Sequence, residues 1–226
     1  MIFSSIIVLG LLGFVFAALL ALAAGYFTIT EDPRLGSILS ILPGSNCGGC
    51  GNPGCRAFAE KLIKGEVVVS GCLAGGPEVA KALAKIMSLA EPTGIRKLLA
   101  TVHCGADENV RTRQAEYAGV PTCRAADLVA AGGLNCSYGC LGYGDCFCVC
   151  PFNAIVMNKG LPMILPDKCT ACGKCVDACP RQIISLRPFE NSVVVACNSH
   201  DNGAYVRKIC SVGCIACKIC EKEVPE

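Results

Sequence analysis

The cysteines are the residues of this chain whose type and spacing can do chemistry. There are 20 of them in 226 residues, and many follow one another in C-x-x-C steps. Such richness is typical either of a disulfide framework in a small secreted domain or of metal ligation in a reducing compartment. Closely spaced thiolates can converge on one metal centre, whereas disulfides usually join distant loops. The spacing therefore favours metal ligation.

The strongest motif is a bacterial ferredoxin run that ends in Cys-Pro. It consists of Cys169, Cys172, Cys175 and Cys179-Pro180. In two-cluster ferredoxins the first three cysteines of such a run bind one cluster, and the fourth binds the neighbouring cluster. Paired C-x-x-C steps also occur in zinc ribbons, which is the competing structural interpretation. The third thiolate and the Cys-Pro ending favour a 4Fe–4S cluster.

The other half of a two-cluster ferredoxin lies 29 residues upstream. Residues 146–151 repeat the C-x-x-x-C-P pattern of residues 175–180. This half departs from the usual spacing, because it begins Cys136-x-x-x-Cys140 and has a longer, glycine-rich loop before Cys146. With the ligands crossed between the halves, the sequence predicts two 4Fe–4S clusters, one on Cys136, Cys140, Cys146 and Cys179 and one on Cys150, Cys169, Cys172 and Cys175.

A separate glycine-rich cysteine set lies nearer the N-terminus. Its members are Cys47, Cys50, Cys55 and Cys72. Glycines around the cysteines allow the backbone to wrap closely around an inorganic core. This set predicts a third 4Fe–4S cluster, with zinc again as the alternative.

A further ferredoxin-like run begins near the C-terminus but lacks its usual ending. Val224-Pro225 stands where Cys-Pro is expected, so the nearest substitute ligand is Cys210, with Cys197 as second choice. We therefore predict a fourth, exposed and more labile 4Fe–4S cluster on Cys210, Cys214, Cys217 and Cys220. A degenerate remnant without metal and a shortened chain are the alternatives.

Four cysteines remain outside these sets: Cys104, Cys123, Cys148 and Cys197. Cys148 is expected to be a buried thiol, because its neighbours are already assigned as ligands. Cys104 and Cys123 are expected to be either structural thiols or ligands. His103, beside Cys104, is expected to be a packing or surface residue.

The first element of the chain is predicted to be a transmembrane helix. Residues 2–27 carry no charged side chain and are long enough to cross the hydrocarbon core of a bilayer. A cleaved signal peptide would have a basic start and a shorter apolar run. Basic residues follow the helix at Arg34, Arg56, Lys61 and Lys64, so the positive-inside rule places the soluble part in the cytoplasm. We expect a single-pass protein of the cytoplasmic membrane.

The remaining elements indicate an α+β protein with a small cysteine-rich iron–sulfur domain and a ferredoxin-like two-cluster domain. Helical periodicity predicts a helix over 78–90, and we expect a strand at 98–103 and a helix near 125–131. The predicted divisions are an anchor (1–28), a linker (29–43), a 4Fe–4S domain (44–95), a connecting segment (96–133), a two-cluster domain (134–190) and a partial ferredoxin-like segment (191–226).

Composition and missing motifs exclude other function classes. The formal net charge is +2 and the charges are evenly spread, so nothing predicts nucleic-acid binding. The chain has neither a G-x-G-x-x-G fingerprint after a strand nor a P-loop, which argues against a self-standing nucleotide-dependent reductase. An electron-transfer subunit of a membrane complex is the favoured class, and a membrane-anchored structural zinc protein is the alternative.

Several motifs in order along the chain resemble one family. After the apolar anchor come Leu42-Pro-Gly-Ser-Asn-Cys-Gly-Gly-Cys-Gly-Asn-Pro-Gly-Cys55, Cys72-Leu-Ala-Gly-Gly76 and Cys136-Ser-Tyr-Gly-Cys-Leu-Gly-Tyr-Gly-Asp-Cys146. This pattern resembles the B subunit of the Rnf complex, the ion-translocating ferredoxin:NAD oxidoreductase. The resemblance implies that soluble reduced ferredoxin donates electrons at the cytoplasmic face, and that partner subunits carry flavins and reduce NAD.

The resemblance also implies that the partner subunits move sodium ions or protons. The chain would then be part of a translocase but not catalytic alone. An electron carrier of another respiratory complex is the alternative within this class.

Overall fold

The computed structural model describes residues 2–26, 32–94, 96–190 and 193–224. Helices and strands both occur, which confirms the α+β class. The elements follow the chain as α1 (Ile2–Tyr26), α2 (Pro33–Ile41), α3 (Cys55–Ile63), η1 (Val69–Gly71), η2 (Leu73–Gly75), α4 (Gly76–Ile86), β1 (Leu98–Val102), α5 (Cys123–Asp127), η3 (Ala130–Gly133), α6 (Asp145–Cys148), β2 (Ile155–Asn158), β3 (Leu161–Ile164), α7 (Lys174–Ala178), β4 (Ile184–Pro188), α8 (Gly203–Ile209) and α9 (Ile219–Glu223).

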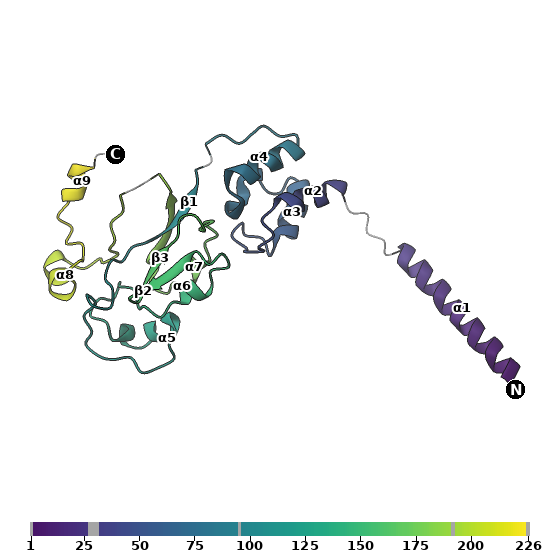
Figure 1. Cartoon of the computed structure of the whole chain (residues 1–226), viewed down its shortest axis with the longest axis horizontal. Coiled ribbons are helices and arrows are strands. Elements are labelled where there is room, and N and C mark those ends of the chain that lie inside the picture. Colours follow the sequence, from purple (N-terminus) through teal and green to yellow (C-terminus); the bar gives the residue numbers. More distant parts are fainter. Residues whose placement is uncertain (1, 27–31, 95, 191–192, 225–226) are drawn as a thin grey trace.

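Helix α1 has the length and composition of a membrane span. Its most apolar stretch, Ile6–Tyr26, has 21 residues and a mean hydropathy of 2.9, and it is not buried against the rest of the chain. The helix projects away from the other elements (Figure 1). This confirms the predicted long apolar helix up to Tyr26, and the predicted last residue, Phe27, lies outside the described residues.

Part of the predicted linker is a helix. Asp32 caps α2 by accepting a hydrogen bond of 2.8 Å from the backbone N–H of Arg34, and Pro33 occupies the first turn. Leu35 and Ile38 of α2 are buried against α3 and α4. The expected linker over 29–43 therefore contains helix α2 from Pro33 to Ile41, because this short amphipathic segment has a strong start signal and an apolar face to bury.

Helices α2, α3 and α4 enclose the first core, which includes Phe58, Leu62 and Leu83. The predicted helix over 78–90 is present as α4, but it begins at Gly76 and ends at Ile86. Ser88 has a left-handed φ of 53°, so the chain has already left the helix there.

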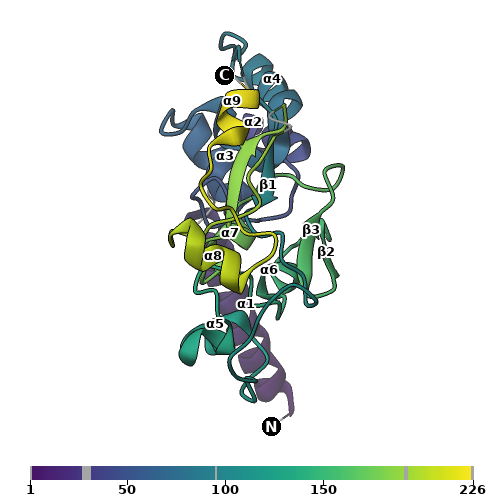
Figure 2. The same ribbon diagram turned by 90° about the vertical axis from the view of Figure 1, so that its left-hand side faces the viewer.

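Two antiparallel strand pairs form the framework of the second half. Strand β2 pairs with β3 as a hairpin, and β1 pairs with β4 from Leu98 opposite Pro188 to Val102 opposite Ile184. The β1–β4 ladder and the neighbouring hairpin are visible in both views (Figures 1 and 2). Strand β1 confirms the predicted strand near 98–103. Segment 96–133, expected to be a connector, thus supplies β1 and α5 to this part of the molecule.

The 29-residue sequence repeat is also a repeat of backbone conformation. Positive φ angles recur at that offset in three residue pairs: Gly142 and Ala171, Gly144 and Gly173, and Asn153 and Gln182. Helices α6 and α7 begin directly after Gly144 and Gly173, respectively, and they pack against each other. The two halves are therefore related in structure, as a two-cluster ferredoxin requires.

The core of this second half is built largely from cysteine. Of its nine buried residues, four are cysteines, and the others are small or aliphatic: Ala100, Ala106, Ile155, Ile183 and Ile184. Thiols rather than large aromatic side chains therefore occupy the centre of the ferredoxin-like part.

Candidate metal centres

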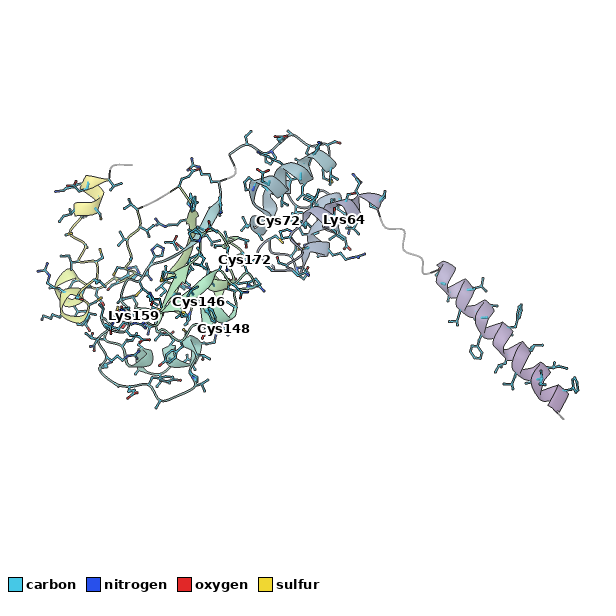
Figure 3. The ribbon with its side chains drawn as sticks, in the orientation of Figure 1. Lys64, Cys72, Cys146, Cys148, Lys159 and Cys172 are labelled. Carbon is cyan, nitrogen blue, oxygen red and sulfur yellow. The ribbon has the colours of Figure 1, made fainter. Side chains whose placement is uncertain are left out.

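Among the described residues, four cavities are each lined by four cysteines, and three of them lie where the sequence predicts clusters. We call these three site 1 (Cys47, Cys50, Cys55 and Cys72), site 2 (Cys150, Cys169, Cys172 and Cys175) and site 3 (Cys123, Cys140, Cys146 and Cys179). They enclose about 330, 340 and 360 Å³ of empty space respectively, part of it open to solvent. Figure 3 labels one cysteine from each site, Cys72, Cys172 and Cys146. The matching donor sets and sizes indicate one kind of occupant.

Site 1 lies on glycine-rich turns before and after α3. Gly48 and Gly51, with φ of 76° and 74°, bend the chain on either side of Cys50. Asn52, which is buried, donates hydrogen bonds from Nδ2 to the carbonyl oxygen and the Sγ of Cys50, at 3.2 and 3.6 Å. The side chain of Asn46 accepts the N–H of Cys55 at 2.9 Å. Two asparagines thus fix the loop that carries three of the four thiols.

Site 2 is formed by the ferredoxin run and by the Cys-Pro of the upstream half. Cys169 and Cys172 lie on the loop before α7, and Cys175 lies within that helix. Cys150 follows α6, and its Sγ accepts the backbone N–H of Ala154 at 3.3 Å. These are the four residues that the crossed ligand pattern predicts for one cluster.

Site 3 differs from the predicted set by one residue. Cys140, Cys146 and Cys179 line it as expected, but the fourth cysteine is Cys123 instead of Cys136. The carboxylate of Asp145, next to Cys146, accepts the backbone N–H groups of Cys123 and Arg124 at 2.8 and 3.0 Å.

An ion pair secures the other end of the helix that carries Cys123. It joins Asp127, the last residue of α5, to Arg181. Site 3 contains Cys123 instead of the predicted Cys136 because α5, which carries Cys123, is held against the ferredoxin halves at both of its ends. The sequence signal for this is weak: it consists of Thr122, whose hydroxyl caps α5 immediately before Cys123.

The structure also corrects the predicted C-terminal set. Cys210 lines a fourth cavity together with Cys104, Cys136 and Cys197, whereas Cys214, Cys217 and Cys220 are exposed. The predicted set of Cys210, Cys214, Cys217 and Cys220 is therefore not brought together. Cys148, expected to be buried, is exposed.

The exposed C-terminal loop nevertheless has the backbone of a ferredoxin ligand loop. Ala216 and Lys218 have φ of 56° and 58°, and they stand where Ala171 and Gly173 stand in the site 2 loop. Helix α9 follows this loop as α7 follows the loop of site 2. The three thiols are thus presented in the conformation that the C-x-x-C-x-x-C motif predicts, without Cys210.

Buried polar side chains without a partner mark each of the cavities. Among the described residues, the buried side-chain donors that find no acceptor are Ser45 Oγ, Thr170 Oγ1, Arg111 Nε and Arg181 Nη1, with Arg181 Nε held only by its ion pair. Ser45 lines site 1, Thr170 lines site 2 and Arg181 lines site 3. Buried donors are normally satisfied, and the sulfurs of an iron–sulfur cluster are acceptors. The residues present fit such a cluster at sites 1 to 3.

The thiols of these sites are in environments that oppose ionisation. Burial raises the pKa of Cys140 and of Cys146 to about 12, and that of Cys175 to about 11. A thiol must lose its proton to bind iron, so metal binding at these sites releases protons. Within the described residues, no three cysteine, histidine or acidic side chains converge as ligands of a single metal ion do.

Neighbouring sites are in direct contact. A Cβ added to Gly49, in the loop of site 1, would lie 2.5 Å from the carbonyl oxygen of Cys172 in site 2. Sites 2 and 3 share the packed helices α6 and α7. The sites therefore form a continuous row from the N-terminal domain into the ferredoxin-like part.

Two family models and several known proteins match this chain. The model of an Fe-S cluster domain matches residues 42–74, and that of the 4Fe-4S binding domain matches residues 162–185. The two matches overlap sites 1 and 2, so the chain is an iron–sulfur protein.

The similar proteins are B subunits of ion-translocating complexes. Identity is 44% over 92% of this chain with the B subunit of the Na(+)-translocating ferredoxin:NAD(+) oxidoreductase complex of Acetobacterium woodii, of which 62% is covered. It is 39% over 98% of this chain with the B subunit of the ion-translocating oxidoreductase complex of Methanosarcina acetivorans, of which 84% is covered. It is 40% over 92% of this chain with the proton-translocating counterpart of Clostridium ljungdahlii, of which 74% is covered.

The chain spans less than two thirds of the Acetobacterium protein but most of the other two. The resemblance read from the cysteine motifs is confirmed: this chain belongs to the family of B subunits of ion-translocating oxidoreductase, or Rnf, complexes.

Proposed function

We propose that this chain relays electrons from soluble reduced ferredoxin to other subunits of a membrane complex that reduces NAD. The observation that carries the proposal is the row of contacting four-cysteine sites. Iron–sulfur clusters take up and release single electrons, and a row of them in contact makes a path. The relatives named above are parts of complexes named for ferredoxin and NAD(+), and for translocation of Na(+) or protons.

The residues of the chain would have three roles in this function. The cysteines of sites 1 to 3 would ligate three 4Fe–4S clusters. Buried donors such as Ser45, Thr170 and Arg181 would hydrogen-bond cluster or ligand sulfurs, and hydrogen bonds of this kind help set reduction potentials. The glycine at position 49 would keep the first two sites in contact. The chemistry with NAD and the movement of ions would belong to partner subunits.

The location proposed for the chain is the cytoplasmic membrane, with the cysteine sites on the cytoplasmic side. Helix α1 supplies the anchor, and Arg34, Arg56, Lys61 and Lys64 follow it. A cytoplasmic position would also keep the thiols reduced for metal binding.

The proposal is tested with anaerobically purified full-length chain in detergent. The three clusters of sites 1 to 3 require at least about twelve irons and as many sulfides per chain. Reduced ferredoxin is expected to reduce them, as followed by loss of their visible absorbance and gain of an electron paramagnetic resonance signal. A chain that contains zinc in place of iron, or clusters that ferredoxin fails to reduce, would contradict the proposal.

A further inference from the structure

The fourth cavity collects four cysteines from widely separated parts of the chain. They are Cys104, Cys136, Cys197 and Cys210, and the cavity encloses about 520 Å³ of empty space, part of it open to solvent. Two of the four, Cys104 and Cys197, lie outside the predicted ligand sets, although Cys197 is the second choice for the C-terminal set.

Long-range polar contacts hold the segments that carry these cysteines. The ring of His103, which precedes Cys104, contacts the carbonyl oxygen of Val195 at 3.2 Å and the hydroxyl of Ser185 at 2.7 Å. The hydroxyl of Thr112 donates a 2.6 Å hydrogen bond to the carbonyl oxygen of Ile209. The segments next to Cys197 and Cys210 are therefore fixed to the ferredoxin-like part. The predicted packing role of His103 agrees with these contacts.

Arg111 provides the fourth cavity with a buried donor that has no acceptor, as Ser45, Thr170 and Arg181 do at the other three. Its two terminal nitrogens donate to the carbonyl oxygens of Cys140 and Gly160 at 2.9 and 2.8 Å. Its Nε is buried without an acceptor, and the residue lines the cavity. A buried donor of positive charge suits a cavity whose occupant is anionic and carries sulfur acceptors.

We infer that Cys104, Cys136, Cys197 and Cys210 form site 4, which binds a further 4Fe–4S cluster. The inference rests on the iron–sulfur chemistry proposed for sites 1 to 3, because the donor set and the orphaned donor are of the same kind. Site 4 continues the row beyond site 3, since the backbone N–H of Cys140 donates to the Sγ of Cys104 at 3.4 Å.

The test compares Cys197→Ala with Cys148→Ala in the anaerobically purified full chain. Cys197 lines the fourth cavity, whereas Cys148 is exposed and serves as the matched control. We expect Cys197→Ala to lose up to about four irons and four sulfides per chain, or to show the signal of a three-iron cluster, and the control to match the parent. Equal iron and sulfide in parent, control and Cys197→Ala, without a new signal, would overturn site 4.

A second measurement does not depend on the folding of that variant. In a chain with Cys214, Cys217 and Cys220 all replaced by Ala, native mass spectrometry is expected to show four 4Fe–4S clusters. Three clusters would overturn site 4 and leave the proposed function standing. Three clusters with one zinc ion would do the same. A chain without iron would overturn both proposals.

Discussion

The backbone N–H of Cys140 donates a hydrogen bond of 3.4 Å to the Sγ of Cys104, although 36 positions separate the two residues. Both side chains are buried, and each lines a different four-cysteine cavity. Hydrogen bonds from backbone amides to ligand sulfurs are among the contacts that tune iron–sulfur centres. One such bond thus connects site 3 to site 4.

The pairing of cysteines is tested by combining substitutions. Because Cys123 and Cys140 line one cavity, Cys123→Ala together with Cys140→Ala is expected to remove about four irons, as either change does alone. Cys136 lines the other cavity, so Cys136→Ala with Cys140→Ala is expected to remove about eight. Iron and sulfide analysis gives the result.

The control for this pairing combines Cys148→Ala with Cys140→Ala, and its iron and sulfide content should equal that of Cys140→Ala alone. A loss of only about four irons in the Cys136 and Cys140 double variant would restore the assignment that the sequence predicts.

Replacing Asp145 should loosen site 3 selectively. Its carboxylate accepts two backbone N–H groups at the start of α5, and losing hydrogen bonds to a charged group costs about 1.5–3 kcal/mol. Asp145→Ala should therefore speed the release of one cluster to an iron chelator, followed as absorbance lost over time. Asp177→Ala, which removes an exposed acid on α7, is the control. Identical release in both variants would count against the role of α5.

Adding a methyl group at Gly49 should separate sites 1 and 2. Its Cβ would lie 2.5 Å from the carbonyl oxygen of Cys172, and overpacking of this kind costs about 1–3 kcal/mol. Gly49 does not have a left-handed φ, so an alanine here is opposed only by its steric clash with Cys172 and not by backbone strain. We expect Gly49→Ala to keep its iron but to slow electron exchange between the two sites, measured by rapid mixing with reduced ferredoxin. Gly36→Ala, which adds a methyl group in open space on α2, should match the parent. If Gly49→Ala exchanges electrons as fast as the parent, the proposed contact between sites 1 and 2 is refuted.

The C-terminal cysteines provide the fourth test. Cys210 lines the fourth cavity, whereas Cys217 lies on the exposed loop. Cys210→Ala is expected to remove the cluster of site 4. The electron paramagnetic resonance spectrum of the reduced protein should then lose the spin coupling between the clusters of sites 3 and 4, whereas Cys217→Ala should leave that coupling unchanged. Loss of the same resonance in both variants would support the predicted C-terminal set instead.

The ferredoxin halves are predictable from the sequence because the features that define them are local. The spacing of Cys169, Cys172 and Cys175 and the Cys-Pro endings dictate a loop and a turn, and the positive φ of Gly173 follows from that loop. The long apolar helix and the strand near Leu98 were predicted for the same reason. Each of these features depends on a few consecutive residues.

The sites of Cys123 and Cys136 are not predictable from the sequence, because tertiary contacts decide which of the two lines site 3. Both precede the ferredoxin run, and the spacing from Cys136 to Cys140 resembles part of a ligand motif. The choice depends on the hydrogen bonds of Asp145 to α5 and on the ion pair of Arg181 with Asp127. The sequence likewise groups Cys210 with its nearest cysteines. In the structure, the hydrogen bond from Thr112 to Ile209, 97 positions apart in the chain, holds the segment of Cys210 at the fourth cavity.

The order of the cysteines along the chain has a consequence for synthesis on the ribosome. The last cysteine that lines site 1 is Cys72, that of site 2 is Cys175, that of site 3 is Cys179, and that of the fourth cavity is Cys210. Chains emerge from the N-terminus and fold domain by domain. The sites are therefore completed in the same order in which they touch one another, so iron can be loaded progressively, starting in the domain that follows helix α1 while the distal thiols have yet to be translated.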